Sequence, residues 1–223
     1  MAIDLIIFDC DGVLIDSEII SAQMLVDELA ALGVHIDLAY VARHFLGRSY
    51  PTVMASIRTD FGLNLPPEFE DLYRNRLMAA FEQNLTVIPH VNDVLNQLAL
   101  PYCVATSSSP KRAERSLQIV GLEVLTRDKL FTAAMVARGK PAPDLFLLCA
   151  NRFQVDPARC LVIEDSLNGI RAARAAGIPV WRFTGGTHLL GRALDEPDDA
   201  RPDRHFASFN TFFDMDPELR RLP

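Results

Sequence analysis

The sequence predicts an α/β fold with a doubly wound, mostly parallel β-sheet and an all-helical segment inserted after the first strand. Two observations predict it: short, continuously apolar runs recur along the chain, and helix-like stretches lie between them. Runs that are apolar at every position suit parallel strands, because helices cover both faces of such a sheet. A long stretch without a strand-like run, from residue 16 to residue 85, predicts the insertion.

The first strand is predicted at Leu5–Phe8, and the inserted segment follows it directly. Within the segment, apolar residues recur at helical spacing up to glycines and prolines that fit helix ends. Its predicted helices are Glu18–Leu32, Asp37–Phe45, Pro51–Phe61 and Pro67–Gln83. We therefore predict two domains: a core of residues 1–15 and 86–223, and a helical cap of residues 16–85 over the carboxyl edge of the sheet. The alternative is that these helices pack on one face of the sheet.

Strands and helices alternate after the insertion. Helices are predicted to begin at Ser109-Pro110, Pro143-Asp144 and Ser166, where N-cap residues or a first-turn proline fit a helix start. Gly121 and Gly177 fit the ends of the first and third of these helices. The remaining predicted strands are Tyr102–Thr106, Leu130–Ala133, Leu161–Ile163 and Val180–Phe183, with a weaker edge strand around Phe206. Such repetition implies right-handed crossovers in one sheet.

Composition excludes several classes of protein. The 223 residues are 49% hydrophobic and 23% charged, which favours a folded chain with a substantial core over disorder. No run approaches the ~20 apolar residues that span a bilayer, and no basic segment precedes the first apolar run as in a signal peptide. A net charge of −7 argues against nucleic-acid binding, which needs a basic face. The four cysteines lack CxxC spacing and predict buried free thiols in a cytoplasmic protein.

Pairs of acids follow two of the predicted strands. Asp9 and Asp11 follow the first strand, and Glu164 and Asp165 follow the fourth. Open α/β sheets bind ligands at the carboxyl ends of their strands, and neighbouring strands lie about 4.8 Å apart. Both pairs are therefore expected within roughly 10 Å of each other, as an oxygen-rich site that suits Mg²⁺. The alternatives are a solvated turn for the first pair and a helix-dipole role for one acid of the second.

Hydroxyls and a lysine are predicted at the same edge. Thr106-Ser107-Ser108-Ser109 ends a strand and starts a helix, and a helix N-terminus attracts anions. Lys140 precedes another helix without the glycine and Ser/Thr of a P-loop. Plain N-capping and a solvated lysine are the alternatives. Carboxylate, metal, hydroxyl and lysine together are the groups that phosphoryl transfer requires.

Four motifs in this order resemble the haloacid dehalogenase superfamily, specifically its phosphatase-like members with a helical cap after the first motif. The first motif matches in two segments, Phe8-Asp9-Cys10-Asp11-Gly12-Val13-Leu14 and Asp16-Ser17-Glu18. The other three are Thr106-Ser107, Gly139-Lys140-Pro141-Ala142-Pro143-Asp144 and Ile163-Glu164-Asp165-Ser166 with Gly169. The resemblance covers nearly the whole chain and is greatest to the β-phosphoglucomutase and sugar-phosphatase branch. It implies a Rossmann-like core with a cap.

The resemblance also implies roles for the acids. Asp9 would be the nucleophile that forms an aspartyl-phosphate. Asp11 would be the general acid for the leaving oxygen and then the base for the attacking water. Mg²⁺ would be held by Asp9, the main-chain carbonyl of Asp11 and Asp165, with Glu164 beside it.

The remaining roles implied by the resemblance concern the phosphoryl group and the rest of the substrate. Thr106 and the backbone N–H of Ser107 would bind the transferring phosphoryl group, and Lys140 would balance the charge around the nucleophile. The Gly47-Arg48-Ser49 segment lies where related enzymes place a substrate-contacting loop. Arg48 is therefore expected to bind the distal part of the substrate, with a solvated arginine as the alternative.

Two positions depart from the family pattern. Ser21 stands where mutase relatives carry a histidine, which weakens the mutase interpretation, and His90 stands where the family usually has glycine. The other histidines show no metal-binding or triad spacing, and with Ser49 they are interpreted as structural or solvent-exposed. They are His35, His44, His188 and His205.

The sequence therefore favours a cytoplasmic, Mg²⁺-dependent phosphatase of small phosphorylated metabolites, sugar phosphates foremost, with no nucleic-acid or membrane partner. A phosphohexose mutase on the same scaffold is the alternative. A receiver-type signalling module is less favoured, because such modules are single domains of roughly 120 residues with a mid-chain phospho-acceptor, whereas the acceptor here is Asp9. The sequence predicts no oligomeric state, and a monomer is compatible with it.

Overall fold

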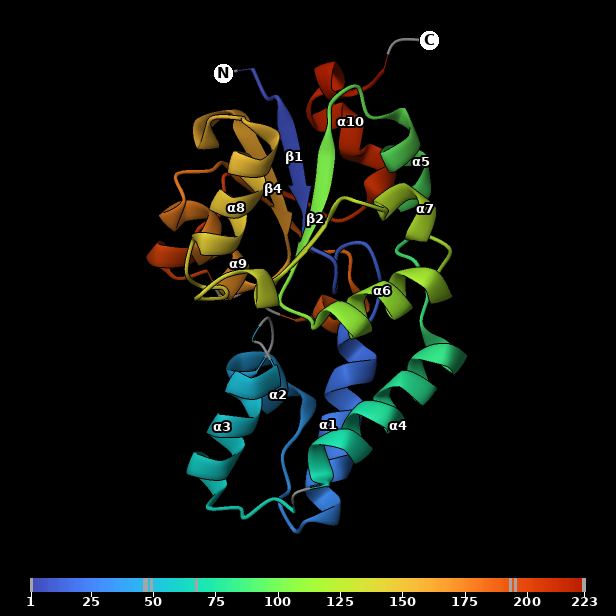
Figure 1. The fold of residues 1–223 in the computed structure, drawn as a ribbon, viewed down its shortest axis with the longest axis vertical. Coiled ribbons are helices and arrows are strands. Elements are labelled where there is room, and N and C mark those ends of the chain that lie inside the picture. The colour runs from blue at the N-terminus through green and yellow to red at the C-terminus, as the bar shows by residue number, and fades with distance from the viewer. Residues whose placement is uncertain are drawn as a thin grey trace.

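Parallel strands form one sheet in the order β3-β2-β1-β4-β5-β6 (Figure 1). The computed structural model describes residues 2–45, 48, 50–66, 68–192, 194 and 196–221. The strands are β1 (Leu5–Phe8), β2 (Tyr102–Thr106), β3 (Leu130–Thr132), β4 (Cys160–Glu164), β5 (Val180–Phe183) and β6 (Arg204–Phe206). Each neighbouring pair is parallel, so the predicted doubly wound parallel sheet is confirmed.

Strand β1 lies at the centre, where the strand order reverses between β2 on one side and β4 on the other. Its alternate side chains enter two different apolar cores. Ile6 and Phe8 join the core under α5 (Val91–Gln97), α6 (Pro110–Ile119), α7 (Glu123–Thr126) and α10 (Phe212–Met215). Leu5 and Ile7 join the core under α8 (Asp144–Phe153) and α9 (Leu167–Ala175). The reversal point is where open α/β sheets place their ligands.

The segment after β1 forms four helices, which we call the helical block. They are α1 (Glu18–Ala31), α2 (Leu38–His44), α3 (Tyr50–Phe61) and α4 (Phe69–Asn84). Figure 1 shows the block beyond the carboxyl ends of β1, β2 and β4, in the lower half of the view. Its helix bounds agree with the predicted ones within two residues, although Pro67 lies outside the described residues. The exact division into a core and a cap at residues 16 and 85 stays a prediction.

Two paired segments connect the block to the sheet. The backbone N–H of Ile88 donates to Leu14 O at 2.9 Å, and the backbone N–H of Asp16 donates to Thr86 O at 2.9 Å. These bonds flank an antiparallel bridge between Ile15 and Val87. The chain therefore enters and leaves the block side by side.

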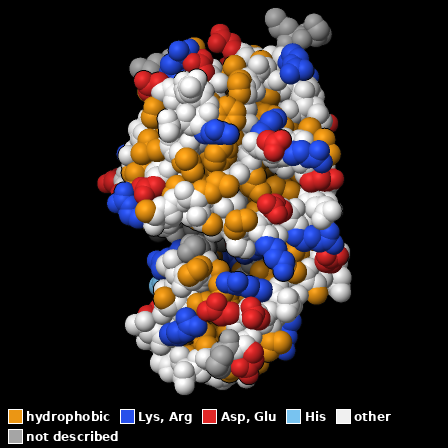
Figure 2. All heavy atoms as spheres, in the orientation of Figure 1, with side chains coloured by type: hydrophobic (Ala, Val, Ile, Leu, Met, Phe, Trp, Pro, Cys, Tyr) orange, Lys and Arg blue, Asp and Glu red, His pale blue; other side chains and the backbone are white. Residues whose placement is uncertain are grey.

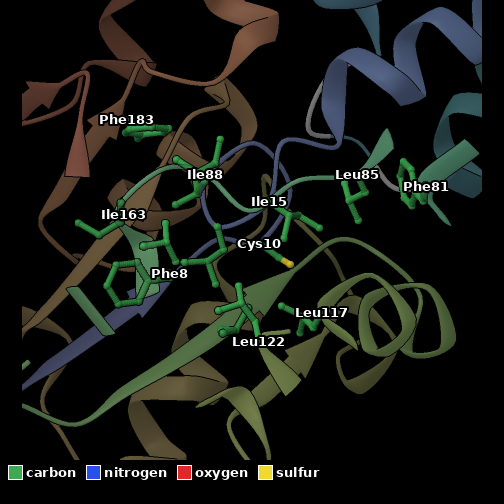
Figure 3. Close-up of a cluster of buried hydrophobic side chains, with 14 of the residues drawn as sticks. Phe8, Cys10, Ile15, Phe81, Leu85, Ile88, Leu117, Leu122, Ile163 and Phe183 are labelled. Carbon is green, nitrogen blue, oxygen red and sulfur yellow. The ribbon is translucent and has the colours of Figure 1, made fainter. Parts of the chain in front are cut away.

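One apolar cluster continues from the sheet into the block. Figure 3 shows Phe8 and Ile163 on the sheet, Ile15 and Ile88 in the two paired segments that connect the block to the sheet, and Phe81 from α4. Each of these side chains is at most 3% exposed, and burying one stabilises the fold by about 1.5–3 kcal/mol. The block and the sheet thus share a core.

His90 has a conformational explanation rather than a chemical one. It is the residue before α5, and its φ of +67° lies in the left-handed region. Glycine adopts this conformation without steric cost, which explains why glycine suits the position and why histidine there carries strain.

The cysteines and the helix lengths agree with the sequence. All of the cysteines are buried and free, as predicted: Cys10, Cys103, Cys149 and Cys160. Within the described ranges, no helix combines the length and apolar character needed to cross a membrane.

Candidate active site

The predicted acids meet at the carboxyl ends of adjacent strands. β1 pairs with β4 so that Phe8 lies opposite Ile163, which brings Asp9 level with Glu164. Asp9, Glu164 and Asp165 are all buried and each offers a carboxylate oxygen within 4.8 Å of the others. The predicted convergence of acids from distant parts of the chain is therefore what the structure contains.

Lys140 joins this acid cluster. Its Nζ donates to Asp9 Oδ1 at 2.6 Å, to Glu164 Oε1 at 2.9 Å and to Ala105 O at 2.9 Å, and its side chain is 1% exposed. Burial disfavours the charged form, but the two carboxylates outweigh it and raise the pKa of Lys140 above its ordinary value. Lys140 is therefore a permanent cation beside the acids.

Glu164 is fully engaged by its neighbours. Its Oε2 accepts hydrogen bonds from Asp165 N at 2.8 Å, Ser166 N at 2.7 Å and Ser166 Oγ at 3.0 Å. Burial raises the pKa of Glu164, but Lys140 and these donors hold it below the ordinary value. Gly169 leaves room for this carboxylate, since a Cβ there would lie 1.7 Å from Oε1. Glu164 therefore anchors Lys140.

Asp165 is in the opposite situation. Its Oδ2 is buried without a hydrogen-bond partner among the described residues. Burial, reinforced by the neighbouring Glu164, raises the pKa of Asp165 well above its ordinary value. Of the two adjacent acids, Asp165 is therefore the one with a buried carboxylate oxygen that accepts no hydrogen bond from the described residues.

The cluster fits a hard divalent cation. Burial also raises the pKa of Asp9 well above its ordinary value, with Glu164 and Asp165 adding to the effect and Lys140 opposing it. One ammonium cannot balance three buried carboxylates, and unpaired buried charge is costly. Carboxylate oxygens are the ligands that Mg²⁺ prefers. Asp9 and Asp165 are therefore suited to hold the ion that the sequence predicts.

Asp11 accepts four hydrogen bonds. Its Oδ1 accepts from Ser17 Oγ at 2.7 Å and Arg112 Nη2 at 3.0 Å. Its Oδ2 accepts from Thr106 Oγ1 at 3.0 Å and Ser108 Oγ at 2.8 Å. Burial raises the pKa of Asp11, but the Arg112 cation and the hydroxyls bring it below the ordinary value. The carboxylate is thus ionised and fixed between β1, β2 and α1.

Arg112 was not identified from the sequence. It lies in the first turn of α6, and its Nη2 also reaches Ser21 Oγ at 3.2 Å. Its guanidinium lies over the ring of Phe81 at 5.2 Å. A basic residue two positions after Pro110, in a helix that starts at a strand end, is the signal that could have identified it.

A cavity of about 1590 Å³ separates the sheet edge from the helical block. Its lining includes Asp9 and Ser107 from the core and Glu18 and Arg48 from the block. Figure 2 shows the waist between these parts hollowed on one side, with Lys and Arg side chains near it. Arg48 lines the cavity and is exposed, whereas Gly47 and Ser49 lie outside the described residues.

Glu18 was part of a matched motif without an assigned role. Burial, with the negative charges of Asp11 and Asp165, raises its pKa to about 7. It lines the cavity from the first turn of α1. The cavity therefore holds a carboxyl group that titrates near neutral pH.

Comparison with known proteins agrees with this geometry. The family model of haloacid dehalogenase-like hydrolases matches residues 3–177. The chain is 27% identical to 6-phosphogluconate phosphatase of Escherichia coli over 187 residues, which cover 83% of this chain and 85% of that protein. It is 32% identical to fructose-1-phosphate phosphatase of Escherichia coli over 179 residues, covering 78% and 92% of the two chains.

A solved structure extends the similarity to the whole fold. A haloacid dehalogenase-like protein of unknown function from Agrobacterium tumefaciens superimposes with a TM-score of 0.80 at 32% identity, covering 96% of this chain and 97% of that one. The matched residues include Asp9, Thr106 and Asp165 at strand ends, and Lys140 in the segment before α8. The chain is therefore an enzyme of the haloacid dehalogenase-like hydrolase family.

Proposed function

We propose that this enzyme is a Mg²⁺-dependent phosphatase that hydrolyses small phosphorylated metabolites, sugar phosphates foremost, through an aspartyl-phosphate on Asp9. The observation that carries the proposal is the meeting of Asp9, Lys140 and Asp165 with Thr106 at adjacent strand ends. The two bacterial relatives named above act on 6-phosphogluconate and fructose 1-phosphate, which supports the substrate class.

Asp9 is arranged as the nucleophile. Lys140 holds its Oδ1, and none of the described residues donates a hydrogen bond to Oδ2, which is left to attack phosphorus. Attack forms the bond from Asp9 to phosphorus and breaks the bond to the leaving oxygen. Thr106 and the backbone N–H of Ser107 bind the phosphoryl oxygens, and the Lys140 charge stabilises the negative charge that develops on them.

Asp11 handles the proton. Because Asp11 is ionised in the free enzyme, it takes up a proton when the negatively charged phosphate group binds beside it, and it gives this proton to the leaving oxygen of the substrate in the first half of the reaction. It then takes the proton from the water that attacks phosphorus, which releases inorganic phosphate and restores Asp9. When held by Asp9, Asp165 and the main-chain carbonyl of Asp11, Mg²⁺ supplies positive charge that offsets the carboxylates and the phosphoryl oxygens.

The helical block sets specificity in this proposal. The cavity is large enough for a sugar phosphate, and Arg48 contacts the distal part of the substrate from the block side. Closure around the substrate excludes water and strengthens the electrostatic interactions in the site. The cytoplasmic location and the absence of a nucleic-acid partner stay predictions from the sequence.

The test is phosphate release from a panel of phosphorylated metabolites with MgCl₂, for the wild type, Asp9→Asn and the exposed control Asp60→Asn. Asp9→Asn is expected to lose activity by about 1000-fold or more, since the nucleophile is removed, whereas Asp60→Asn keeps it. Acid-quenched wild type should carry one phosphoryl group that Asp9→Asn lacks. Full activity of Asp9→Asn would refute the nucleophile, full activity in EDTA would refute the metal, and no hydrolysis of any substrate would refute the function.

A further inference from the structure

His188 packs directly against the acid cluster. It lies in a short 3₁₀ helix (Thr187–Leu189) that follows β5 at the same sheet edge, and it is 4% exposed. Its Nε2 lies 2.8 Å from Asp165 Oδ2. The three atoms Nδ1, Nε2 and Oδ2 are nevertheless buried without a hydrogen bond in the described part of the chain. A histidine and a carboxylate thus face each other with unused hydrogen-bonding capacity.

Two glycines create the space for this contact. A Cβ at Gly186 would lie 2.6 Å from His188 Cε1. A Cβ at Gly12 would lie 2.1 Å from Asp165 Oδ2 and 2.9 Å from the same Cε1. A side chain at Gly186 would displace the imidazole, and one at Gly12 would displace the carboxylate or the imidazole. The backbone is therefore shaped to bring His188 and Asp165 together.

The segment that carries His188 is anchored on the opposite side. The backbone N–H of Thr187 donates to Asp16 Oδ1 at 3.1 Å, and its hydroxyl donates to the same oxygen at 2.9 Å. Asp16 belongs to the connection that leads into the helical block. Both ends of the contact are consequently held: Asp165 by β4 and His188 by this anchor.

The imidazole lies outside the group of possible ligands. Asp9, Glu164 and Asp165 form the set of described residues whose ligand atoms lie within 4.8 Å of one another, and His188 is not in that set. Carboxylates that hold metals are commonly hydrogen-bonded by outer partners that fix their orientation, and losing such a partner costs about 10–100-fold in metal affinity. A neutral imidazole has one N–H to donate and suits this task.

We propose that His188 is a positioning residue that restrains the carboxylate of Asp165 in the orientation that binds the divalent cation. The proposal rests on the metal site of the proposed function and adds a residue to it. A hydrogen bond from Nε2–H to Oδ2 would satisfy two of the three unpartnered atoms, and the 2.8 Å between Nε2 and Oδ2 is within hydrogen-bond distance. Glu164 cannot restrain Asp165 Oδ2 in this way, because its own two oxygens accept hydrogen bonds from Lys140 Nζ and Ser166 N.

The test measures cation binding without substrate. Mg²⁺ and Mn²⁺ are titrated calorimetrically into the wild type, His188→Leu, His188→Gln and the exposed control His35→Leu. His188→Leu is expected to weaken binding about 10–100-fold, and His35→Leu to leave it unchanged. His188→Gln, whose side-chain amide can donate to the same oxygen, should recover most of the affinity. A folded His188→Leu protein that binds Mg²⁺ as tightly as the wild type would overturn the proposal.

A second measurement separates positioning from ligation. Pulsed EPR of the Mn²⁺-loaded wild type should show no hyperfine coupling from a directly bonded nitrogen. Such a coupling that disappears in His188→Leu would make His188 a ligand and overturn the proposal. If His188→Leu does not fold, as judged by circular dichroism, the EPR of the wild type and the affinity of His188→Gln decide. A wild type that binds no divalent cation would instead refute the metal part of the proposed function.

Discussion

Arg112 on α6 forms an ion pair with Asp11 at the end of β1, with 3.0 Å between Nη2 and Oδ1. The two side chains are 23% and 12% exposed, so water screens the pair only in part. The same guanidinium contacts Ser21 on α1 and the ring of Phe81 on α4. One cation thus joins the sheet edge to two helices of the block.

Replacing Arg112 by Met should destabilise the fold. The Asp11 carboxylate would stay buried without its cation, at a cost of about 2–3 kcal/mol at pH 7. Since Arg112 lowers the pKa of Asp11, its contribution is present above the unfolded-state pKa and is lost as pH falls through the folded-state pKa. Urea unfolding at several pH values measures the deficit. Arg115→Met, which breaks an exposed pair with Glu82, should cost less than about 1 kcal/mol, and an equal loss in both variants would contradict the interpretation.

Removing Lys140 should leave two buried acids without their cation and destabilise the fold. In Lys140→Met, Asp9 and Glu164 lose their shared cation inside the protein, and we expect a loss of about 3–5 kcal/mol at neutral pH. Adding Glu164→Gln to this variant removes one of the two buried charges that lost their partner and should restore part of the stability. Lys111→Met, at an exposed position of the same cavity, should change stability by less than about 0.5 kcal/mol. Chemical denaturation of the four proteins checks this, and a double variant no more stable than the single one would be inconsistent with it.

Glu18 should make metal-free protein less stable as pH rises. Its pKa is about 7 in the folded protein against an ordinary value of 4.5, so the folded state binds the proton more tightly. The free energy of unfolding therefore falls between these pH values as the carboxyl group ionises. Glu18→Gln removes this cost. Above pH 7 its free energy of unfolding should exceed that of the wild type by at most about 3 kcal/mol, and near pH 4 the two should be equal.

Urea unfolding of the metal-free proteins at pH 4, 5.5 and 8 measures the effect of Glu18. The exposed Glu114, which lines the same cavity, provides the control variant Glu114→Gln. A stability difference between Glu18→Gln and the wild type that stays constant with pH would disprove the prediction.

Gly12 and Gly33 offer a matched pair of substitutions. Both have φ of +81°, so alanine at either should cost about 1–2 kcal/mol of stability through the backbone alone. At Gly33 no atom lies within 4 Å of the added Cβ, whereas at Gly12 the Cβ would meet Asp165 Oδ2. Only Gly12→Ala should therefore weaken Mg²⁺ binding, by about tenfold or more. Calorimetric titration with Mg²⁺ decides, and equal affinities would refute the role of this close approach.

The acids were predictable because they follow strands directly. Asp9, Thr106 and Asp165 come at the ends of short apolar runs, and parallel strands bring their carboxyl ends to one edge. The inference also assumed that these strands are neighbours in the sheet, and β1 does lie between β2 and β4. The same rule also applies to His188, which follows β5 after a pair of glycines, but its spacing matches no known ligand pattern.

Other contacts depend on three-dimensional detail that a single sequence does not contain. Ser17 precedes α1 as an N-cap residue would, yet its hydroxyl donates to Asp11 rather than to its own helix. Whether Lys111 or Arg112 reaches Asp11 depends on the rotation of α6 about its axis. Helices α7 and α10 have four residues each, too few for helical periodicity to be visible.

The apolar cluster that joins the sheet to the helical block limits how the helices of the block can be exchanged for those of another enzyme. Exchanging α1–α4 for the corresponding helices of another hydrolase would replace the chain between Ile15 and Ile88. The new helices would have to pack in the cluster that contains Phe8. Helices whose side chains do not fit this cluster would leave it poorly packed next to Asp9. A change of substrate preference made by exchanging these helices as a unit would therefore need compensating changes in the shared core.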